Sequence, residues 1–452
     1  MKIVLFFMCL TSWSQLFSQN IRGKVVDHNN VPLENVNVYL KKYQIGTVSD
    51  MDGYFDLKTH ELIKENDTIH FSLLGYSITS ITLLDFKSRE NIIVLSEKTE
   101  ELKEVLLERK VKLKDKLKFT KLTSMHYAVF AFGSSVNNNK IYILGGNESV
   151  QTDVGKKAVI MSNGLISGLQ DFAKLTRRYA EKSRHGFSDK LQVYDLETES
   201  WLENKIELNN RAYHNLNYYE GSLYAIGGKQ ISNNGRFEYL NDKVESINID
   251  SLVVRVDETN PHQSINFTSV VYNDYLIVLG GSYKKTATAP ISYKDKVHFY
   301  NFKTGLWYEL TEMLNPKEVN GVLLEDKIYL FGGYKDKDLS DIEIFDLVEG
   351  SWKTIGNLPI TMKRPALAVN GSDIYIYENG IMLFFDARKR TIMKFHLNLQ
   401  LKEANMHYYN DALYIIGGYE ESHYSKAASP YIYKIKLSEF LKTKSTVLKL
   451  DK

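Results

Sequence analysis

The stretch KIYLFGGYKDKDLSDIEIFDLVEGSW, residues 327–352, decides the fold. Its first part is an apolar strand that ends in Gly332-Gly333, and after a polar loop a second strand is followed by Asp346 and Trp352. Two strands and a short loop cannot bury their own apolar faces. The stretch therefore predicts a protein built from several copies of this unit, packed against one another.

Further copies of the first half occur along the chain. KIYILGG, SLYAIGG, YLIVLGG and ALYIIGG end at Gly146, Gly228, Gly281 and Gly418, while DIYIYEN at residues 373–379 has lost the glycines. The first position of each pair falls at 145, 227, 280, 332, 378 and 417. These positions indicate a repeat of roughly 50 residues with one large insertion.

The second half repeats as well, with an Asp or Asn followed six residues later by Trp201, Trp307 or Trp352. Glycine pair, aromatic-rich strand and Trp at this period resemble the kelch repeat of β-propellers, over about 320 residues. The resemblance implies six four-stranded blades around a central channel. We expect the glycines to permit a close backbone approach, and the Trp side chains to pack between neighbouring blades.

The chain begins with MKIVLFFMCLTSWSQLFSQN, which combines one Lys, an apolar run and a small-polar region. This pattern predicts a secretory signal peptide over residues 1–19, too short for a membrane span. Cys9, the one cysteine of the chain, lacks the small residue expected before a lipidated cysteine. We therefore expect cleavage near Gln19, no lipid and no thiol in the mature chain. The expected location is the periplasm or the outer membrane and cell surface.

Composition sets further bounds. With 452 residues, 43% hydrophobic and 25% charged, the chain is long enough for at least two cores. A net charge of +2 gives no indication of nucleic-acid binding. No stretch after the signal approaches a membrane span in length, so we expect a soluble or peripherally attached protein. Thirty Tyr against seven Pro is typical of an all-β protein.

Residues 20–97 alternate apolar and polar positions over short runs, which predicts a small β-sandwich. G-x-V-x-D at 23–27, P-L-x-x-V-x-V at 32–38, G-T-x-S-D-x-D-G-x-F at 46–55 and L-G-Y at 74–76 resemble the carboxypeptidase regulatory-like domain. The resemblance implies an accessory domain without peptidase chemistry, commonly found at the N-terminus of exported proteins of Bacteroidetes. The expected fold class is all-β, with an Ig/transthyretin-like sandwich followed by a six-bladed kelch β-propeller.

Within this domain, Asp50, Asp52 and Gly53 match the beginning of a calcium loop. A calcium loop needs further oxygen ligands and an acidic residue near its twelfth position, where the chain has Leu62 beside Glu61. We favour a plain Asp-Gly turn between two strands, which also explains the glycine.

The remaining boundaries are a charged linker over 98–115, the propeller over 116–440 and a C-terminal tail over 441–452. Residues 116–122 resemble the tail of a blade, and the last repeat lacks an Asp-to-Trp segment of its own. We predict that residues 116–122 supply the outermost strand of the last blade and so close the ring. The competing segment is STVLKL, residues 445–450.

Insertions fall mostly after the glycine pairs, which predicts that one rim of the propeller is elaborated. The first insertion is about 43 residues long and includes LQDFAKLTRRYAEK, residues 169–182, with helical spacing of its apolar positions. A lid over the channel and packed decoration are both compatible with this segment.

Candidate chemistry is sparse. His126, His214 and His407 lie at unequal distances from their strand Tyr residues, so no metal triad is expected. Copper oxidases of the galactose-oxidase type need a Tyr linked to Cys, which the mature chain lacks, and we expect no cofactor. Acid-base chemistry of the kelch-type sialate mutarotase kind stays open, because it needs only a carboxylate and a cation. No Glu or Asp of the inner strands stands out as the base.

Cations recur where the chain enters its inner strands. Lys317, Lys363 and Lys402 lie twelve residues before a strand Tyr, and Arg211 lies thirteen before another. Local hydrogen bonding within each repeat explains such a pattern as well as ligand binding does. The functional hypothesis is a positive, aromatic-lined channel mouth that attracts an anion. Its candidate ligand-binding residues are Arg211, His214, Lys317, Tyr334, Lys363, Arg364, Lys402 and Tyr419.

We expect an exported protein of the cell envelope that binds a glycan or protein ligand, anionic under the hypothesis above, without catalysis. The alternative is a sugar-processing enzyme of the sialate mutarotase kind, since fold does not fix function. A carboxylate facing the channel beside a cation would favour the enzyme. An aromatic and basic rim without such a carboxylate would favour binding. The sequence carries no signal for an oligomeric state.

Overall fold

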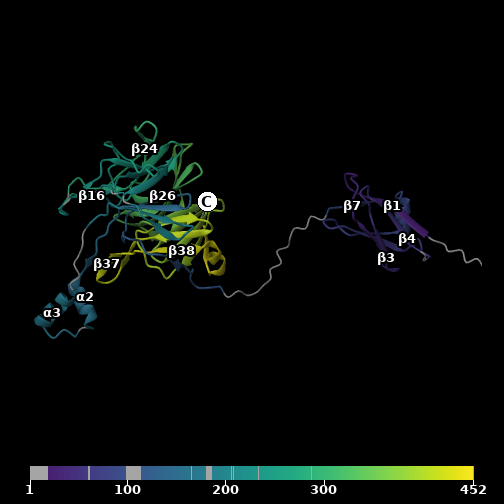
Figure 1. Cartoon of the computed structure of the whole chain (residues 1–452), viewed down its shortest axis with the longest axis horizontal. Coiled ribbons are helices and arrows are strands. Elements are labelled where there is room, and N and C mark those ends of the chain that lie inside the picture. Colours follow the sequence, from purple (N-terminus) through teal and green to yellow (C-terminus); the bar gives the residue numbers. More distant parts are fainter. Residues whose placement is uncertain are drawn as a thin grey trace, which may run out of the picture. The chain divides into compact units, whose positions relative to one another are not determined.

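The computed structural model describes residues 19–59, 62–97, 113–163, 165–179, 186–204, 206, 208–232, 234–286 and 288–450. The chain divides into two units, Met1–Arg109 and Lys110–Lys452, which are drawn in Figure 1. The expected signal segment, apart from Gln19, and most of the expected linker lie outside the described residues.

The first unit is a β-sandwich, as expected. One sheet has the order β4-β1-β7 and the other the order β3-β2-β5-β6. Strands of both sheets alternate buried and exposed positions, and Val25, Val38, Ile69 and Phe71 are fully buried between them. The elements are β1 (Gln19–Asp27), β2 (Asn37–Leu40), β3 (Ile45–Val48), β4 (Tyr54–Thr59), β5 (Thr68–Ser72), β6 (Thr79–Thr82), α1 (Leu83–Ser88) and β7 (Ile92–Leu95).

The Asp-Gly segment of this unit forms a turn between β3 and β4. One Asp50 carboxylate oxygen accepts hydrogen bonds from the backbone N–H of Asp52 (3.1 Å) and of Tyr54 (2.8 Å). Gly53 has a φ of 77°, and a Cβ there would lie 2.5 Å from the carbonyl oxygen of Val25. The position therefore requires glycine for the turn itself.

The second unit contains six antiparallel sheets, each with four strands of one repeat, which are the blades of a propeller (Figure 1). Blade 1 has β9 (Gly133–Asn137), β10 (Lys140–Leu144), β12 (Leu191–Asp195) and β13 (Ser200–Leu202); blade 2 has β14 (Asn215–Tyr219), β15 (Ser222–Ile226), β18 (Val244–Asn248) and β19 (Val254–Asp257). Blade 3 has β20 (Thr268–Tyr272), β21 (Tyr275–Leu279), β24 (Lys296–Asn301) and β25 (Trp307–Glu312); blade 4 has β26 (Glu318–Leu324), β27 (Lys327–Lys335), β28 (Lys337–Asp346) and β29 (Ser351–Met362). Blade 5 has β30 (Ala366–Asn370), β31 (Asp373–Glu378), β32 (Ile381–Asp386) and β33 (Thr391–His396); blade 6 has β34 (Asn405–Tyr409), β35 (Ala412–Ile416), β38 (Ile432–Lys436) and β8 (Thr120–Lys121).

The predicted ring closure is confirmed. Strand β8 pairs with β38 through Lys121 opposite Tyr433 and Thr120 opposite Lys434, so the start of the propeller completes its last blade. The competing C-terminal segment forms β39 (Thr446–Lys449), which pairs with β33 and makes blade 5 five-stranded. Pairing the two ends of the ring removes open sheet edges that would otherwise be exposed.

The repeated glycines and tryptophans have the packing roles expected of them. Gly332 has a φ of 61°, and a Cβ there would lie 2.5 Å from the carbonyl oxygen of Met362. Each Trp packs against an apolar cluster that includes residues of the preceding blade: Trp201 with the cluster of Tyr414, Trp307 with that of Ile226 and Trp352 with that of Ile277. Burial of aromatic surface between blades therefore holds the ring together.

One rim is elaborated, as predicted. The insertions after the glycine pairs form short sheets, namely β16 (Lys229–Ile231) with β17 (Glu238–Leu240), β22 (Ser282–Tyr283) with β23 (Ser292–Tyr293), and β11 (Gln151–Thr152) with β37 (Ser425–Ala428) and β36 (Tyr419–Glu421). The first insertion continues into α2 (Val154–Met161) and α3 (Leu169–Tyr179), and the predicted helix over 169–182 is confirmed for residues 169–179. None of the helices in the described ranges is long and apolar enough to cross a membrane.

Candidate functional site

The inner strands of the six blades surround a central channel. A cavity of about 510 Å³ in this channel is lined by residues of β9, β14, β20, β26, β30 and β34. Small and polar side chains predominate on these strands, among them Ser134, Asn217, Ser269, Asn320 and Asn405. A channel of this size with few apolar anchors suits a polar ligand or ordered water.

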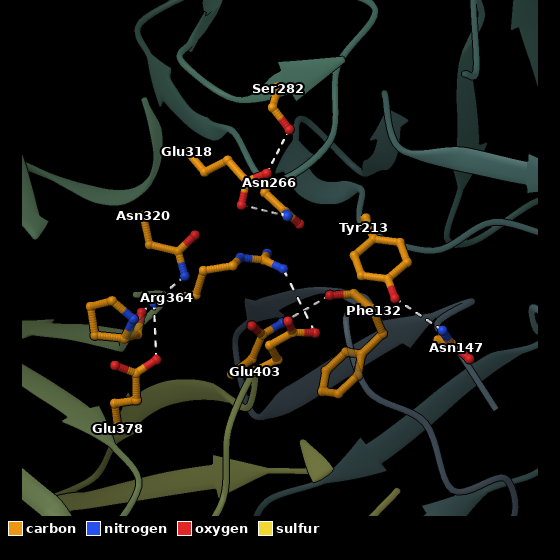
Figure 2. A network of polar contacts seen from close by, with 12 residues as sticks. Phe132, Asn147, Tyr213, Asn266, Ser282, Glu318, Asn320, Arg364, Glu378 and Glu403 are labelled. Carbon is orange, nitrogen blue, oxygen red and sulfur yellow. Dashed lines mark hydrogen bonds and ion pairs between the residues drawn. The ribbon is translucent and has the colours of Figure 1, made fainter. Parts of the chain in front are cut away.

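A ring of side chains marks one end of this channel. Each blade contributes one residue, which lies fourteen positions before the first residue of its glycine pair or, in blade 5, before Glu378, which replaces that glycine. We call this set the channel ring, and it consists of Ala131, Tyr213, Asn266, Glu318, Arg364 and Glu403. Figure 2 shows the five polar members gathered around a common space, with the Arg364 guanidinium reaching toward its centre.

The backbone of the channel ring is held in an unusual conformation. Ala131, Tyr213, Asn266 and Glu403 have φ values of 51°, 60°, 58° and 50°. The left-handed region costs side chains other than Gly about 1–2 kcal/mol per residue. Such strain often accompanies functional sites, where the surrounding structure compensates for it. Backbone hydrogen bonds between adjacent blades do so here, for example from Tyr213 N to Ala131 O at 2.6 Å.

Arg364 owes its position to the loss of the glycine pair in blade 5. Glu378 stands where the other repeats have their first glycine, and its two carboxylate oxygens accept the backbone N–H groups of Lys363 and Arg364, each at 2.9 Å. Burial raises the pKa of Glu378, while these two hydrogen bonds favour its charged form. The repeat that departs most from the pattern therefore positions the one guanidinium of the channel ring.

The Arg364 side chain has unused hydrogen-bonding capacity. It is only 9% exposed, and its Nη1 lies 3.9 Å from Oε2 of Glu403 in the next blade. Within the described residues, Arg364 Nε and Nη1 and Glu403 Oε2 have no hydrogen-bond partner. In folded proteins, the polar atoms of a buried guanidinium or carboxylate normally form hydrogen bonds with protein groups, a ligand or ordered water. The pair therefore marks a place for a ligand or for ordered water.

The other polar members of the channel ring already take part in hydrogen bonds with protein side chains. Both Glu318 oxygens accept hydrogen bonds, from Asn266 Nδ2 at 2.9 Å and from Ser282 Oγ at 2.5 Å. The Tyr213 hydroxyl accepts one from Asn147 Nδ2 at 3.0 Å, as Figure 2 shows. Burial raises the pKa of Tyr213 to about 12, so its hydroxyl is neutral at physiological pH. It keeps a proton that it can donate into the channel.

Aromatic rings and lysines surround the channel ring on the elaborated rim. Lys426 Nζ lies 3.8 Å from the centre of the Tyr419 ring, and burial lowers the pKa of this lysine. Lys363 Nζ lies 4.1 Å from the Tyr334 ring, and Lys402 pairs with Glu421 at 2.7 Å. Of the predicted site residues, the structure thus brings Lys363, Arg364, Tyr334, Tyr419 and Lys402 to this rim.

Two predicted site residues, Arg211 and Lys317, do not line the mouth, which corrects the expected belt of cations. Both have fully buried side chains inside their blades. Arg211 is paired with Glu245, while Lys317 is paired with Asp341 and, at 2.8 Å, with Glu343. Their charges are therefore matched locally and hold the blade together.

His214 is also buried, at 2% exposure, and its two ring nitrogens lack partners among the residues described. Burial holds its pKa well below the usual value, so the ring is neutral. No group of three or more His, Cys, Asp or Glu side chains suited to a metal ion occurs in the part of the chain that the structure describes.

A second buried histidine, His262, makes the propeller sensitive to acid. His262 is fully buried, with Nε2 2.8 Å from the carbonyl oxygen of Gly280, and burial lowers its pKa to about 3. The unfolded chain binds a proton below about pH 6.5, whereas the folded propeller resists it until about pH 3. Stability is therefore lost as the pH falls, on the order of 2 kcal/mol at about pH 5 from this side chain.

Urea unfolding of the propeller at about pH 7 and about pH 5, followed by fluorescence of its Trp residues, measures this loss. His262→Gln keeps a donor toward Gly280 but cannot titrate, so its stability should change less between the two pH values. An equal change in both proteins would mean that other groups cause the acid sensitivity.

The comparisons with known proteins agree with this architecture. Residues 179–384 match the model of the KLHDC2/KLHL20/DRC7 Kelch-repeats domain, and residues 21–107 match that of the CarboxypepD_reg-like domain. Kelch-like protein 23 of Homo sapiens is 25% identical over 223 residues, 39% of this chain and 38% of that protein. Kelch repeat and BTB domain-containing protein 2 of Cowpox virus (strain Brighton Red) is 23% identical over 158 residues, 34% of this chain and 27% of that protein. The chain thus covers about a third of the length of these relatives.

Among solved structures, the one titled "Structure of YjhT" superposes with a TM-score of 0.51 at 13% identity, covering 73% of this chain and 99% of that one. At this identity the likeness concerns the fold alone.

Proposed function

We propose that this chain, in which a CarboxypepD_reg-like domain precedes a kelch-repeat propeller, is an exported binding protein of the cell envelope. Its ligand is a glycan or protein segment that presents an anionic group to the channel ring. Kelch repeats and the kelch-like relatives support a propeller that acts through protein interaction. The export step rests on the signal-like first nineteen residues.

The observation that carries the proposal is the Arg364 guanidinium. It is nearly buried, fixed at its backbone by Glu378, and has two nitrogens without partners among the described residues. A planar guanidinium binds a carboxylate through two parallel hydrogen bonds, and such pairs are stronger in a recess than on an open surface. Tyr213, Asn266 and the rim aromatics then offer contacts to the rest of the ligand.

The balance of positive and negative side chains on the rim restricts the class of ligand that fits there. Arg364, Lys363, Lys402 and Lys426 are accompanied by Glu403, Glu378 and Glu421, so the mouth is not a broad positive surface. A densely charged polyanion is therefore disfavoured. A ligand with one carboxylate among neutral hydroxyl or amide groups fits the arrangement, as in an acidic sugar residue or a peptide carboxylate.

To test the proposal, we would screen the full chain against arrays of acidic glycans, their neutral counterparts and carboxylate-bearing peptides. We expect retention of ligands with a single carboxylate over their amidated or neutral matches. Equal retention of acidic and neutral members would contradict the proposal.

A second candidate function, a sugar-processing enzyme of the sialate mutarotase kind, is favoured by one observation. Glu403 lies in the channel lining beside Arg364, the combination of carboxylate and cation that such acid-base chemistry needs. In this reading Arg364 holds the substrate carboxylate, and Glu403 moves a proton to or from a sugar hydroxyl.

The Glu403→Gln variant separates the two functions. A binding protein keeps its affinity when this carboxylate becomes an amide, whereas an enzyme keeps substrate but loses turnover. Exchange between the anomers of an acidic sugar, followed by NMR, is the readout. Acceleration by the wild type that disappears in Glu403→Gln would establish catalysis, and no acceleration by the wild type would exclude it for that sugar.

A further inference from the structure

The helical hairpin of the first insertion carries an exposed apolar tip. We define the apolar tip by described residues at the end of α2, at Leu165 and at the start of α3. Its side chains are Val159, Ile160, Met161, Leu165 and Leu169, with exposed fractions of 47%, 38%, 46%, 85% and 86%. Five large aliphatic side chains, each more than a third exposed within eleven residues of the chain, are unusual on a protein surface, where such residues occur singly.

The hairpin is a built element with a fixed base. Asp153 caps α2 by accepting the backbone N–H of Lys156 at 2.9 Å. The backbone N–H of Asp153 itself donates to Tyr424 O at 2.8 Å, and β11 pairs with β37 of the last blade. Ala158 of α2 is fully buried, whereas α3 has no buried residue. In Figure 1 the two helices protrude from the blades. The base lies at the N-terminal end of α2, whereas the apolar tip begins at its C-terminal end.

The shaft of the hairpin is basic. Between residues 153 and 179 the chain has five cations against two carboxylates, Asp153 and Asp171. The cations are Lys156, Lys157, Lys174, Arg177 and Arg178, all displaced from the apolar tip toward the base. At 1.5 Å per helical residue, Lys157 lies about 5 Å behind Ile160, and Lys174 and Arg177 lie about 8–12 Å behind Leu169.

This order of apolar and basic groups matches one partner, a lipid surface. Apolar side chains of interfacial helices reach about 5–10 Å into the boundary between headgroups and acyl chains. Lysines and arginines set back by that distance lie at the level of the headgroups, where each is attracted to anionic lipid. A protein partner would require no such layering along the hairpin axis.

We infer that the apolar tip inserts into an anionic phospholipid surface and that the basic shaft holds it there, so that the propeller is a peripheral membrane protein. This inference does not depend on the ligand proposed for the channel ring. The hairpin then acts as an anchor on the elaborated rim and not as a lid over the channel.

Sedimentation of the full chain with vesicles tests the inference. Vesicles of equal parts phosphatidylglycerol and phosphatidylcholine are compared with vesicles of phosphatidylcholine alone. We expect binding to the anionic vesicles to be stronger by about tenfold or more, because several cations contribute. A Leu165→Trp variant should show a blue shift of its added fluorescence with anionic vesicles only.

Two variants assign the binding to the hairpin. Ile160→Ser combined with Leu165→Ser and Leu169→Ser should lower binding by about tenfold or more, since buried methylenes carry the insertion. Lys174→Gln with Arg177→Gln and Arg178→Gln should abolish the preference for anionic lipid. As a matched control, Val253→Ser, Leu306→Ser and Val348→Ser remove three exposed apolar side chains elsewhere on the propeller and should change nothing.

Three outcomes would overturn the inference. The wild type binds anionic vesicles no better than neutral ones, or the control variant loses binding as the tip variant does. The third is self-association of the wild type in light scattering, lost in the tip variant, without vesicle binding. That result would assign the apolar tip to an interface between copies of this chain.

Discussion

Replacing Glu245 by Ala should lower the free energy of unfolding of the propeller by about 3–5 kcal/mol. Glu245 and Arg211 are 2% and 0% exposed, and the carboxylate also accepts Asn209 Nδ2 at 2.6 Å. The substitution leaves the Arg211 guanidinium buried without its counter-charge. Burial disfavours the charged form of this side chain and lowers its pKa. Urea unfolding followed by Trp fluorescence measures the change.

Glu309→Ala is the matched control. This carboxylate pairs with Lys296 on the surface at 2.8 Å, with side chains 54% and 36% exposed, and its removal should cost at most about 1 kcal/mol. Equal losses in the two variants would mean that the buried pair is not a support of the blade and that Arg211 is free to serve a ligand.

The Arg364→Gln variant should lose about 2–5 kcal/mol of affinity for a carboxylate ligand, roughly 30-fold or more. Glutamine cannot form the charged double hydrogen bond, and it leaves the ligand carboxylate desolvated in the recess. The fold should survive, because Glu378 contacts the backbone N–H groups at 363 and 364 and not the side chain. Calorimetric titration with a ligand from the screen measures the loss.

Lys402→Gln serves as the control for this prediction. Lys402 is 40% exposed and already paired with Glu421, so we expect its removal to change affinity by at most about 1 kcal/mol. A larger effect at Lys402 than at Arg364 would return the binding site to the belt of cations predicted from the sequence.

The fold was predictable because its signals are local and repeated. Five of the six repeats keep the glycine pair, whose positive φ and close backbone approach disfavour other residues, and three keep the Trp that packs between blades. The strand that closes the ring was recognisable from the same pattern, since residues 116–122 resemble the tail of a blade that lacks its inner part.

The site was predictable only in part. Counting twelve residues back from the strand Tyr residues found Lys363 and Lys402, but the position that faces the channel is the next residue along, Arg364 or Glu403. Glu403 was missed because its direction depends on a backbone φ of 50° that no residue-type pattern announces. The usable signal was register: in each of the six repeats, the residue after the twelve-back position is a member of the channel ring.

Arg211 and Lys317 show the opposite error. Both were predicted as ligand-binding residues because they lie twelve or thirteen residues before a strand Tyr, close to the register of the exposed cations. Their partners Glu245 and Glu343 lie on the third strands, opposite Ala225 and Leu330, which lie two residues before the glycine pairs. An acidic residue at that strand position indicates a buried pair, and the sequence contains it.

The most direct test of the channel ring as the ligand site is a crystal structure of the full chain with a carboxylate ligand from the screen. The ligand carboxylate should lie about 3 Å from the guanidinium nitrogens of Arg364, with Tyr213 or Asn266 contacting the remainder. A ligand bound elsewhere, on the hairpin or on the accessory sandwich, with Arg364 still without a partner, would show that the channel ring is not the ligand site.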